Sequence, residues 1–163
     1  MAQNITLQGA SYTDVPWVDL PKTGGGTARF VDVSEMDDYV VAHGTSALGN
    51  AHWTWRVWNS GVAECWLKTG TTTVNAWSLW ANNIYYSTSA LGGISFPTNF
   101  FADVPDRATV EFIATANDAW VGYTTAPTAS KSPEIYLLRP NQTSCTGYLQ
   151  YYACGTVSSS WTG

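Results

Sequence analysis

Two runs of aromatic and β-branched residues lie on either side of a short polar turn between Trp53 and Trp66, in the segment WTWRVWNSGVAECW. In the first run, Trp53, Trp55 and Val57 fall on one parity, which is the alternation of a strand with one buried face. The tripeptide Asn59-Ser60-Gly61 supplies residue types that tolerate positive φ in a tight turn. The segment therefore predicts a β-hairpin. It also holds more tryptophan than one small core needs, so we expect some of these rings to face a partner.

The chain carries few charges and many aromatic rings. Of its 163 residues, 12% are charged and 14% are aromatic, with nine tryptophans and nine tyrosines. The polar surface must therefore consist largely of Ser, Thr, Asn and Gly. Because charged residues are depleted where subunits meet, this composition favours self-association.

The net charge is −5, and the seven basic residues are scattered along the sequence. Nucleic-acid binding and electrostatic attachment to a membrane surface both need a basic cluster, so neither is expected. No apolar stretch approaches the roughly 20 residues of a membrane-spanning helix, so membrane insertion is not expected either. The first residues, MAQNITLQGA, lack the charged and apolar regions of a signal peptide.

Short predicted strands with turn signals about every 8–12 residues are typical of an all-β fold, an antiparallel β-sandwich or a barrel-like domain. Residues 1–45 are predicted to form a small N-terminal β unit, and residues 52–163 the head domain. Gly44–Ala51 is predicted to be the linker. Apolar residues nowhere keep the spacing of a helix, and the best helical candidate is a turn or two at Ser34–Tyr39.

Several strand predictions rest on local pattern alone. Ala108–Ala114 and Ala119–Thr125 are predicted to form a second hairpin, and Leu79–Ser87 has the composition of a strand. Val15–Leu20 is predicted to be a strand at a sheet edge, because a proline within it cannot donate to a neighbouring strand.

Cysteine and histidine positions argue against a disulfide framework and against a metal site. Three cysteines are present, an odd number, and we expect Cys65, Cys145 and Cys154 to be buried and reduced. The alternative is a Cys145–Cys154 bridge across a hairpin formed by CTGYLQYYAC. His43 and His52 lie far from the cysteines, so zinc ligation is not expected. No metal and no cofactor are predicted.

No set of catalytic residues is recognisable. A polysaccharide hydrolase would need two carboxylates about 5–9 Å apart. The candidates are Asp103, Asp106, Glu111, Asp118 and Glu134. Turn chemistry explains the aspartates beside Pro105, and a strand glutamate can pair with Arg or Lys across a sheet, so we expect no enzyme. In the first hairpin, Arg56 and Glu64 are predicted to pair with each other.

A saccharide-binding cluster is predicted where the second hairpin turns. Sugar sites combine an aromatic face with polar groups that bind hydroxyls. The candidates are Asn117, Asp118, Trp120 and Tyr123. Trp120 and Tyr123 have opposite strand parity, so at most one of them faces a given side. The alternative is that Trp120 belongs to the core and Asn117-Asp118 only form the turn.

Three parts of the sequence resemble bacteriophage structural proteins. NITLQGASYTDVPWVDLPKTGGGTARFVDVS resembles a short module of phages and prophages of Gram-positive bacteria. WRVWNSGVAECW, followed about 30 residues later by FPTNFF, resembles the distal part of phage tail-fibre and baseplate proteins. FIATANDAWVGYTTAP with GYLQYYACG is similar to the trimeric receptor-binding heads of lactococcal phages.

The resemblance implies a virion protein that is assembled in the host cytoplasm as a homotrimer. Its N-terminal module would attach to other virion proteins, and its head would bind a host cell-wall saccharide without turnover. Two alternatives stay open: a capsid or tail decoration protein without host contact, and a tail-associated glycan hydrolase. Surplus aromatic residues would lie at the subunit seam; besides those of the first hairpin, they are Trp77, Trp80, Tyr85 and Tyr86.

Overall fold

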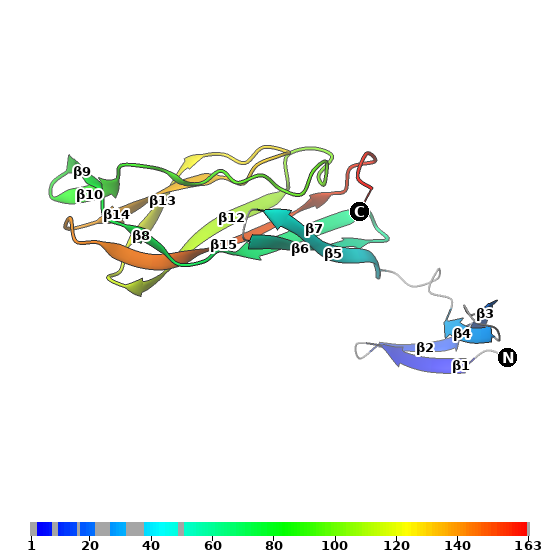
Figure 1. Cartoon of the computed structure of the whole chain (residues 1–163). Coiled ribbons are helices and arrows are strands. Elements are labelled where there is room, and N and C mark those ends of the chain that lie inside the picture. The colour runs from blue at the N-terminus through cyan, green and yellow to red at the C-terminus, as the bar shows by residue number, and fades with distance from the viewer. Residues whose placement is uncertain are drawn as a thin grey trace. The chain divides into compact units, whose positions relative to one another are not determined.

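The computed structural model describes residues 3–7, 10–15, 17–21, 27–31, 38–48 and 51–162, and side chains from residue 38 onward (Figure 1). All regular structure among these residues is β-strand in antiparallel sheets, and none of it is helix, as predicted. The chain divides into two compact units, Met1–Tyr39 and Val40–Gly163.

The first unit contains two separate two-stranded sheets. One pairs β1 (Gln3–Leu7) with β2 (Ala10–Val15), and the other pairs β3 (Trp17–Pro21) with β4 (Thr27–Val31). The predicted strand Val15–Leu20 is therefore divided between two sheets. Most of the helical candidate Ser34–Tyr39 lies outside the described residues.

The larger sheet of the second unit has six strands, in the order β12-β15-β7-β6-β5, with β8 also paired to β15. Its strands are β5 (Val40–Leu48), β6 (Ala51–Trp58), β7 (Val62–Lys68), β8 (Thr72–Val74), β12 (Arg107–Ala116) and β15 (Cys145–Thr156).

The predicted first hairpin is confirmed as β6 and β7. Thr54 lies opposite Trp66 and Val57 opposite Ala63. Gly61 has a φ of 83°, and its amide donates a 2.9 Å hydrogen bond to the carbonyl oxygen of Trp58. A side chain at this φ is strained, so the glycine allows the turn.

The predicted linker Gly44–Ala51 is wrong, because Gly44–Leu48 belong to β5 and Ala51 begins β6, while residues 49–50 lie outside the described residues. Residues up to Leu48 continue β5, whose Gly44 lies opposite Trp55 of β6. Small and polar residues made this segment look like a linker, but Gly44 is needed here for packing. A methyl group on it would lie 2.6 Å from the Trp55 ring.

The smaller sheet has five strands, with β14 paired to β10, β11 and β13, and β9 paired to β10. Its strands are β9 (Trp77–Ala81), β10 (Ile84–Ser87), β11 (Leu91–Gly92), β13 (Trp120–Thr125) and β14 (Glu134–Arg139). Leu79–Ser87 is thus a hairpin and not one strand. Asn82 and Asn83 have φ values of 47° and 64°, and asparagine tolerates this left-handed region in two-residue turns.

The predicted second hairpin is also wrong. β12 pairs with β15 in the larger sheet, whereas β13 pairs with β14 in the smaller sheet. The connection at Ala116–Ala119 therefore carries the chain from one sheet to the other. Alternation within each strand was recognised correctly, but it does not specify which strand is the neighbour.

Cys145 and Cys154 do not flank a hairpin, because both lie in the single strand β15. Cys145 and Cys154 lie nine positions apart in an extended strand, which places them about 30 Å from each other, far beyond disulfide distance. All three cysteines are free thiols, with Cys65 and Cys145 buried and Cys154 half-buried.

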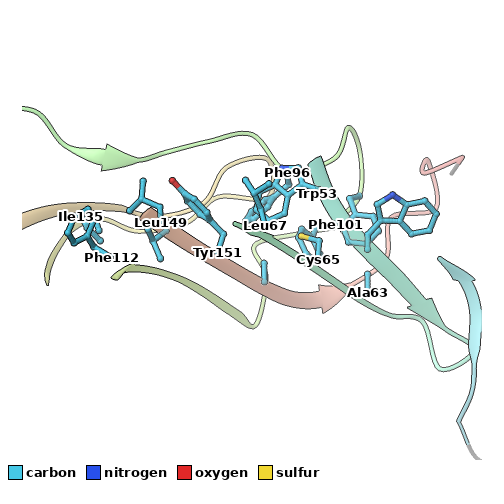
Figure 2. Packing of buried hydrophobic residues seen from close by; sticks show 14 of the residues in the cluster. Trp53, Ala63, Cys65, Leu67, Phe96, Phe101, Phe112, Ile135, Leu149 and Tyr151 are labelled. Atoms are coloured by element: carbon cyan, nitrogen blue, oxygen red, sulfur yellow. The ribbon is translucent and has the colours of Figure 1, made fainter. Parts of the chain in front are cut away.

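Both sheets contribute to one hydrophobic core (Figure 2). Phe112 of β12 lies opposite Leu149 of β15, and Ile135 of β14 belongs to the same core. Further along, Trp53 contacts the rings of Phe96 and Tyr151, with centroid distances of 5.5 and 5.9 Å. The arrangement is compatible with the predicted sandwich, and the sheets do not close into a barrel.

Candidate functional site

Of the four residues predicted to bind saccharide, Asn117 and Asp118 lie at the crossover between β12 and β13, and Trp120 and Tyr123 lie in β13. Asn117 has a φ of 60° and lies at the crossover between the sheets. Its side-chain amide donates to the Ser144 carbonyl oxygen at 2.9 Å, and its own carbonyl oxygen accepts from the Cys145 thiol at 2.7 Å. Asn117 therefore fastens the crossover to the start of β15 through its side-chain NH2 group and its backbone carbonyl oxygen.

Tyr123 also uses its polar group within the fold. Its hydroxyl donates to the Val110 carbonyl oxygen at 3.1 Å and accepts from the Val110 amide at 3.3 Å. These bonds join β13 of one sheet to β12 of the other. Tyr123 lies opposite the buried Ile135, whereas Trp120 lies opposite Leu138 on the other face and is 60% exposed. The opposite parity predicted for the two rings is confirmed.

A different set of residues meets on the outer face of the larger sheet, the face turned away from the core. Strand register places Tyr152 of β15 between Trp66 of β7 and Thr109 of β12. In the next row, Gln150 lies between Lys68 and Glu111. Residues from three distant parts of the sequence thus form one surface.

This surface is hollowed into a shallow groove of about 430 Å³, here called the β15 groove. Residues of β15 form its floor and residues of β7 and β12 its sides. The groove is lined by, among others, Trp66, Lys68, Arg107, Glu111, Gln150 and Tyr152. The groove is open to solvent, so it can accept a ligand that lies on the sheet.

The two cations of the β15 groove, Lys68 and Arg107, each lie over an aromatic ring. The Lys68 ammonium lies 4.0 Å from the Tyr148 ring centroid, and the Arg107 guanidinium lies 5.7 Å from that of Tyr152. Among the described residues, no carboxylate lies within ion-pair distance of either cation, and no cation within that distance of Glu111. These three groups can therefore bind an incoming ligand.

Glu64 orders the aromatic residues beside the groove. It accepts hydrogen bonds from the Tyr152 hydroxyl at 2.7 Å, from the Trp58 indole at 3.1 Å and from the Arg56 guanidinium. The predicted Arg56–Glu64 pair is confirmed. Burial raises the pKa of Glu64, but the bonds from Arg56, Tyr152 and Trp58 outweigh burial and leave it below its ordinary value.

Arg56 in turn lies between two tryptophan rings, 4.9 Å from the Trp58 centroid and 5.6 Å from the Trp66 centroid. Cation–π contact of this kind restrains both rings. Trp66, with 38% of its surface exposed, is therefore held as a fixed aromatic wall of the groove.

A second concave surface, the β14 aromatic face, lies on the outer side of the smaller sheet. Trp80, Tyr86, Tyr136 and Leu138 line a hollow of about 510 Å³ there. No charged side chain among the described residues lines it. Trp120 borders the same face, because it lies opposite Leu138. The described lining of the β14 aromatic face thus differs from the β15 groove in lacking charged groups.

Two of the other carboxylates considered for catalysis, Asp103 and Glu134, accept hydrogen bonds from nearby groups of the protein. The Asp103 carboxylate accepts from the Val104 amide at 2.7 Å, which is turn chemistry. The Glu134 carboxylate accepts from the Thr125 hydroxyl at 3.0 Å. Over the described ranges no three His, Cys, Asp or Glu side chains are grouped to hold a metal ion. Nor do those ranges include a helix long and apolar enough to cross a membrane.

Comparison of the chain with protein-family models, with curated proteins and with solved structures finds no match.

Sequence reasoning missed the β15 groove because its parts are far apart in the chain. Trp66 and Tyr152 are direct neighbours across two paired strands, although they lie 86 positions apart in the sequence. The available signal was alternation: Trp66 and Lys68 fall on one parity, as do Gln150 and Tyr152. That pattern marks an outward face but does not indicate which faces are adjacent.

Proposed function

We propose that this chain is a non-catalytic adhesin of a phage virion that binds a host cell-surface saccharide in the β15 groove. The observation that carries the proposal is the position of Trp66 and Tyr152 beside charged and amide groups that form no ion pair with any residue that the structure describes. An aromatic ring stacks on the C–H face of a pyranose, while amide and charged groups bind its hydroxyls. The groove supplies both, from Trp66 on one side and from Gln150 and Glu111 beside it.

The restraint of the rings favours binding. Glu64 fixes Tyr152 directly and restrains Trp66 through Arg56. Side chains that are ordered before binding lose less conformational entropy when a ligand arrives. Saccharide binding to an exposed sheet benefits from this, because each sugar ring contributes only a modest contact.

The virion assignment rests on the sequence resemblance to phage tail-fibre and baseplate proteins. In this proposal the small N-terminal unit attaches the protein to other virion proteins. The head forms a homotrimer through the β14 aromatic face. Tyrosine and tryptophan are enriched and charge is depleted at interface cores, which is the composition of that face.

The β14 aromatic face also favours a second function, that of a structural protein without host contact. If the β14 aromatic face binds another virion protein and the β15 groove binds nothing, the chain is a capsid or tail decoration protein. The two functions differ in what the isolated protein binds: intact host cells and glycans in the first case, phage particles alone in the second.

The test uses fluorescently labelled full-length protein on host cells and on a glycan array. Trp66→Ala should abolish binding to both, because it removes the aromatic wall. Val104→Ala is the control, since Val104 is an exposed apolar residue that lines neither the β15 groove nor the β14 aromatic face. Wild-type protein that decorates phage particles but binds no cell and no glycan would refute adhesion and support the decoration function.

A further inference from the structure

The charged groups of the β15 groove are of both signs and are spaced too widely to neutralise one another. Lys68 and Glu111 lie in one row with Gln150 between them. Two strand spacings separate their backbones by about 10 Å. Arg107 lies four residues from Glu111 along β12, about 13 Å away. A neutral sugar would leave all three charges without a counter-charge.

The groove is also distinct in charge from the rest of the chain. It presents two cations and one anion, whereas the whole chain has a net charge of −5. An anionic group on a ligand would find Lys68 or Arg107, and a cationic group would find Glu111. The contacts of Lys68 with Tyr148 and of Arg107 with Tyr152 hold both cations over rings and leave their N–H groups available.

We propose that the β15 groove selects a zwitterionic saccharide, one that carries both a free amine and an anionic substituent. This inference rests on the proposed saccharide binding and adds the chemistry of the ligand. Lys68 and Arg107 bind the anionic substituent, carboxylate or phosphate, and Glu111 binds the ammonium. Trp66 and Tyr152 contact the sugar rings between them.

The experiment compares four polymers that share one backbone. Carboxymethyl chitosan carries both charges, carboxymethyl chitin only the anion, chitosan only the amine, and chitin oligosaccharides neither. Affinity is measured by biolayer interferometry with the full-length protein, at a mildly acidic pH that keeps the amine protonated. Phosphorylated chitosan in place of the carboxymethyl polymer shows which anion is preferred. We expect carboxymethyl chitosan to bind most tightly, by about two- to five-fold per charge contact.

Single-charge variants assign each preference to its residue. Glu111→Gln should remove the preference for the free amine and keep that for the anion. The double variant Lys68→Met/Arg107→Met should remove the preference for the anion and keep that for the free amine. Lys131→Met is the control, since Lys131 is an exposed cation outside the groove.

Two outcomes separate this inference from the proposed function. Equal affinity for all four polymers that Trp66→Ala abolishes would overturn charge selection and leave saccharide binding intact. No binding to any of the four would also overturn the selection, and the glycan array then decides independently whether the chain binds sugar.

Discussion

The hydroxyl of Tyr152 donates a 2.7 Å hydrogen bond to the carboxylate of Glu64, across the pairing of β15 with β7. The two residues lie 88 positions apart in sequence. Their contact links the centre of the larger sheet to the aromatic surface that we propose as the binding site. It also makes a single half-buried carboxylate responsible for the order of several rings.

Glu64 should make stability depend on pH. Its folded pKa is below its ordinary value, so its contribution is complete above about pH 4.3 and is lost as the pH falls through the folded pKa. Glu64→Gln should lower the free energy of unfolding at neutral pH by about 1–2 kcal/mol and flatten the acid limb. Urea denaturation between acidic and neutral pH measures both effects. Glu111→Gln is the control and should change neither; an unchanged acid limb in Glu64→Gln would contradict the prediction.

Gly147 should not tolerate a side chain. A methyl group there would lie 2.4 Å from the Ile113 carbonyl oxygen and 2.6 Å from the Phe112 ring. Gly147→Ala should therefore destabilise the protein by about 1–3 kcal/mol, because strand β12 must shift to make room. Gly70→Ala is the matched control, since its methyl group would meet no described atom within 4 Å. Thermal denaturation measures both, and equal melting temperatures would show that the β12–β15 packing is wrong.

The thiols should remain reduced and react slowly. Burial raises the pKa of the Cys65 thiol, and it also raises the pKa values of the Cys145 and Cys154 thiols. Since the thiolate is the reactive form, labelling with a thiol reagent at neutral pH should be slow in native protein and fast in denaturant. Intact mass after alkylation in denaturant should show three modified cysteines, with or without prior reduction. A Cys145–Cys154 disulfide in the peptide map would contradict the continuous strand β15.

The β14 aromatic face should control oligomeric state. Trp80 and Trp120 are 65% and 60% exposed, and in the proposed homotrimer a charge at either position would be buried between subunits. Trp80→Glu and Trp120→Glu should each convert a trimer to a monomer, as measured by light scattering coupled to size-exclusion chromatography. Val104→Glu, at a residue 51% exposed, should leave the trimer unchanged. A monomeric wild-type protein would refute trimerisation outright.

Local sequence was sufficient wherever a structural feature is itself local. The β6–β7 hairpin follows from the alternation of Trp53, Trp55 and Val57 and from the positive φ that Gly61 accepts. The Arg56–Glu64 pair followed from the same register, because both residues lie within one hairpin. The crossover at Asn117 shows the limit: its turn was recognised, but its neighbours Ser144 and Cys145 come from a remote strand.

The sequence by itself determined that this protein is all-β, where the first hairpin turns, and that its aromatic residues exceed what one core requires. Only the tertiary structure decided that β12 and β13 belong to different sheets, that β15 is one strand, and that Trp66 lies beside Tyr152. The physical reason is that alternation fixes which side chains share a face of one strand. Which strands become neighbours depends on how the two sheets bury their apolar faces against each other, and that is a property of the whole chain.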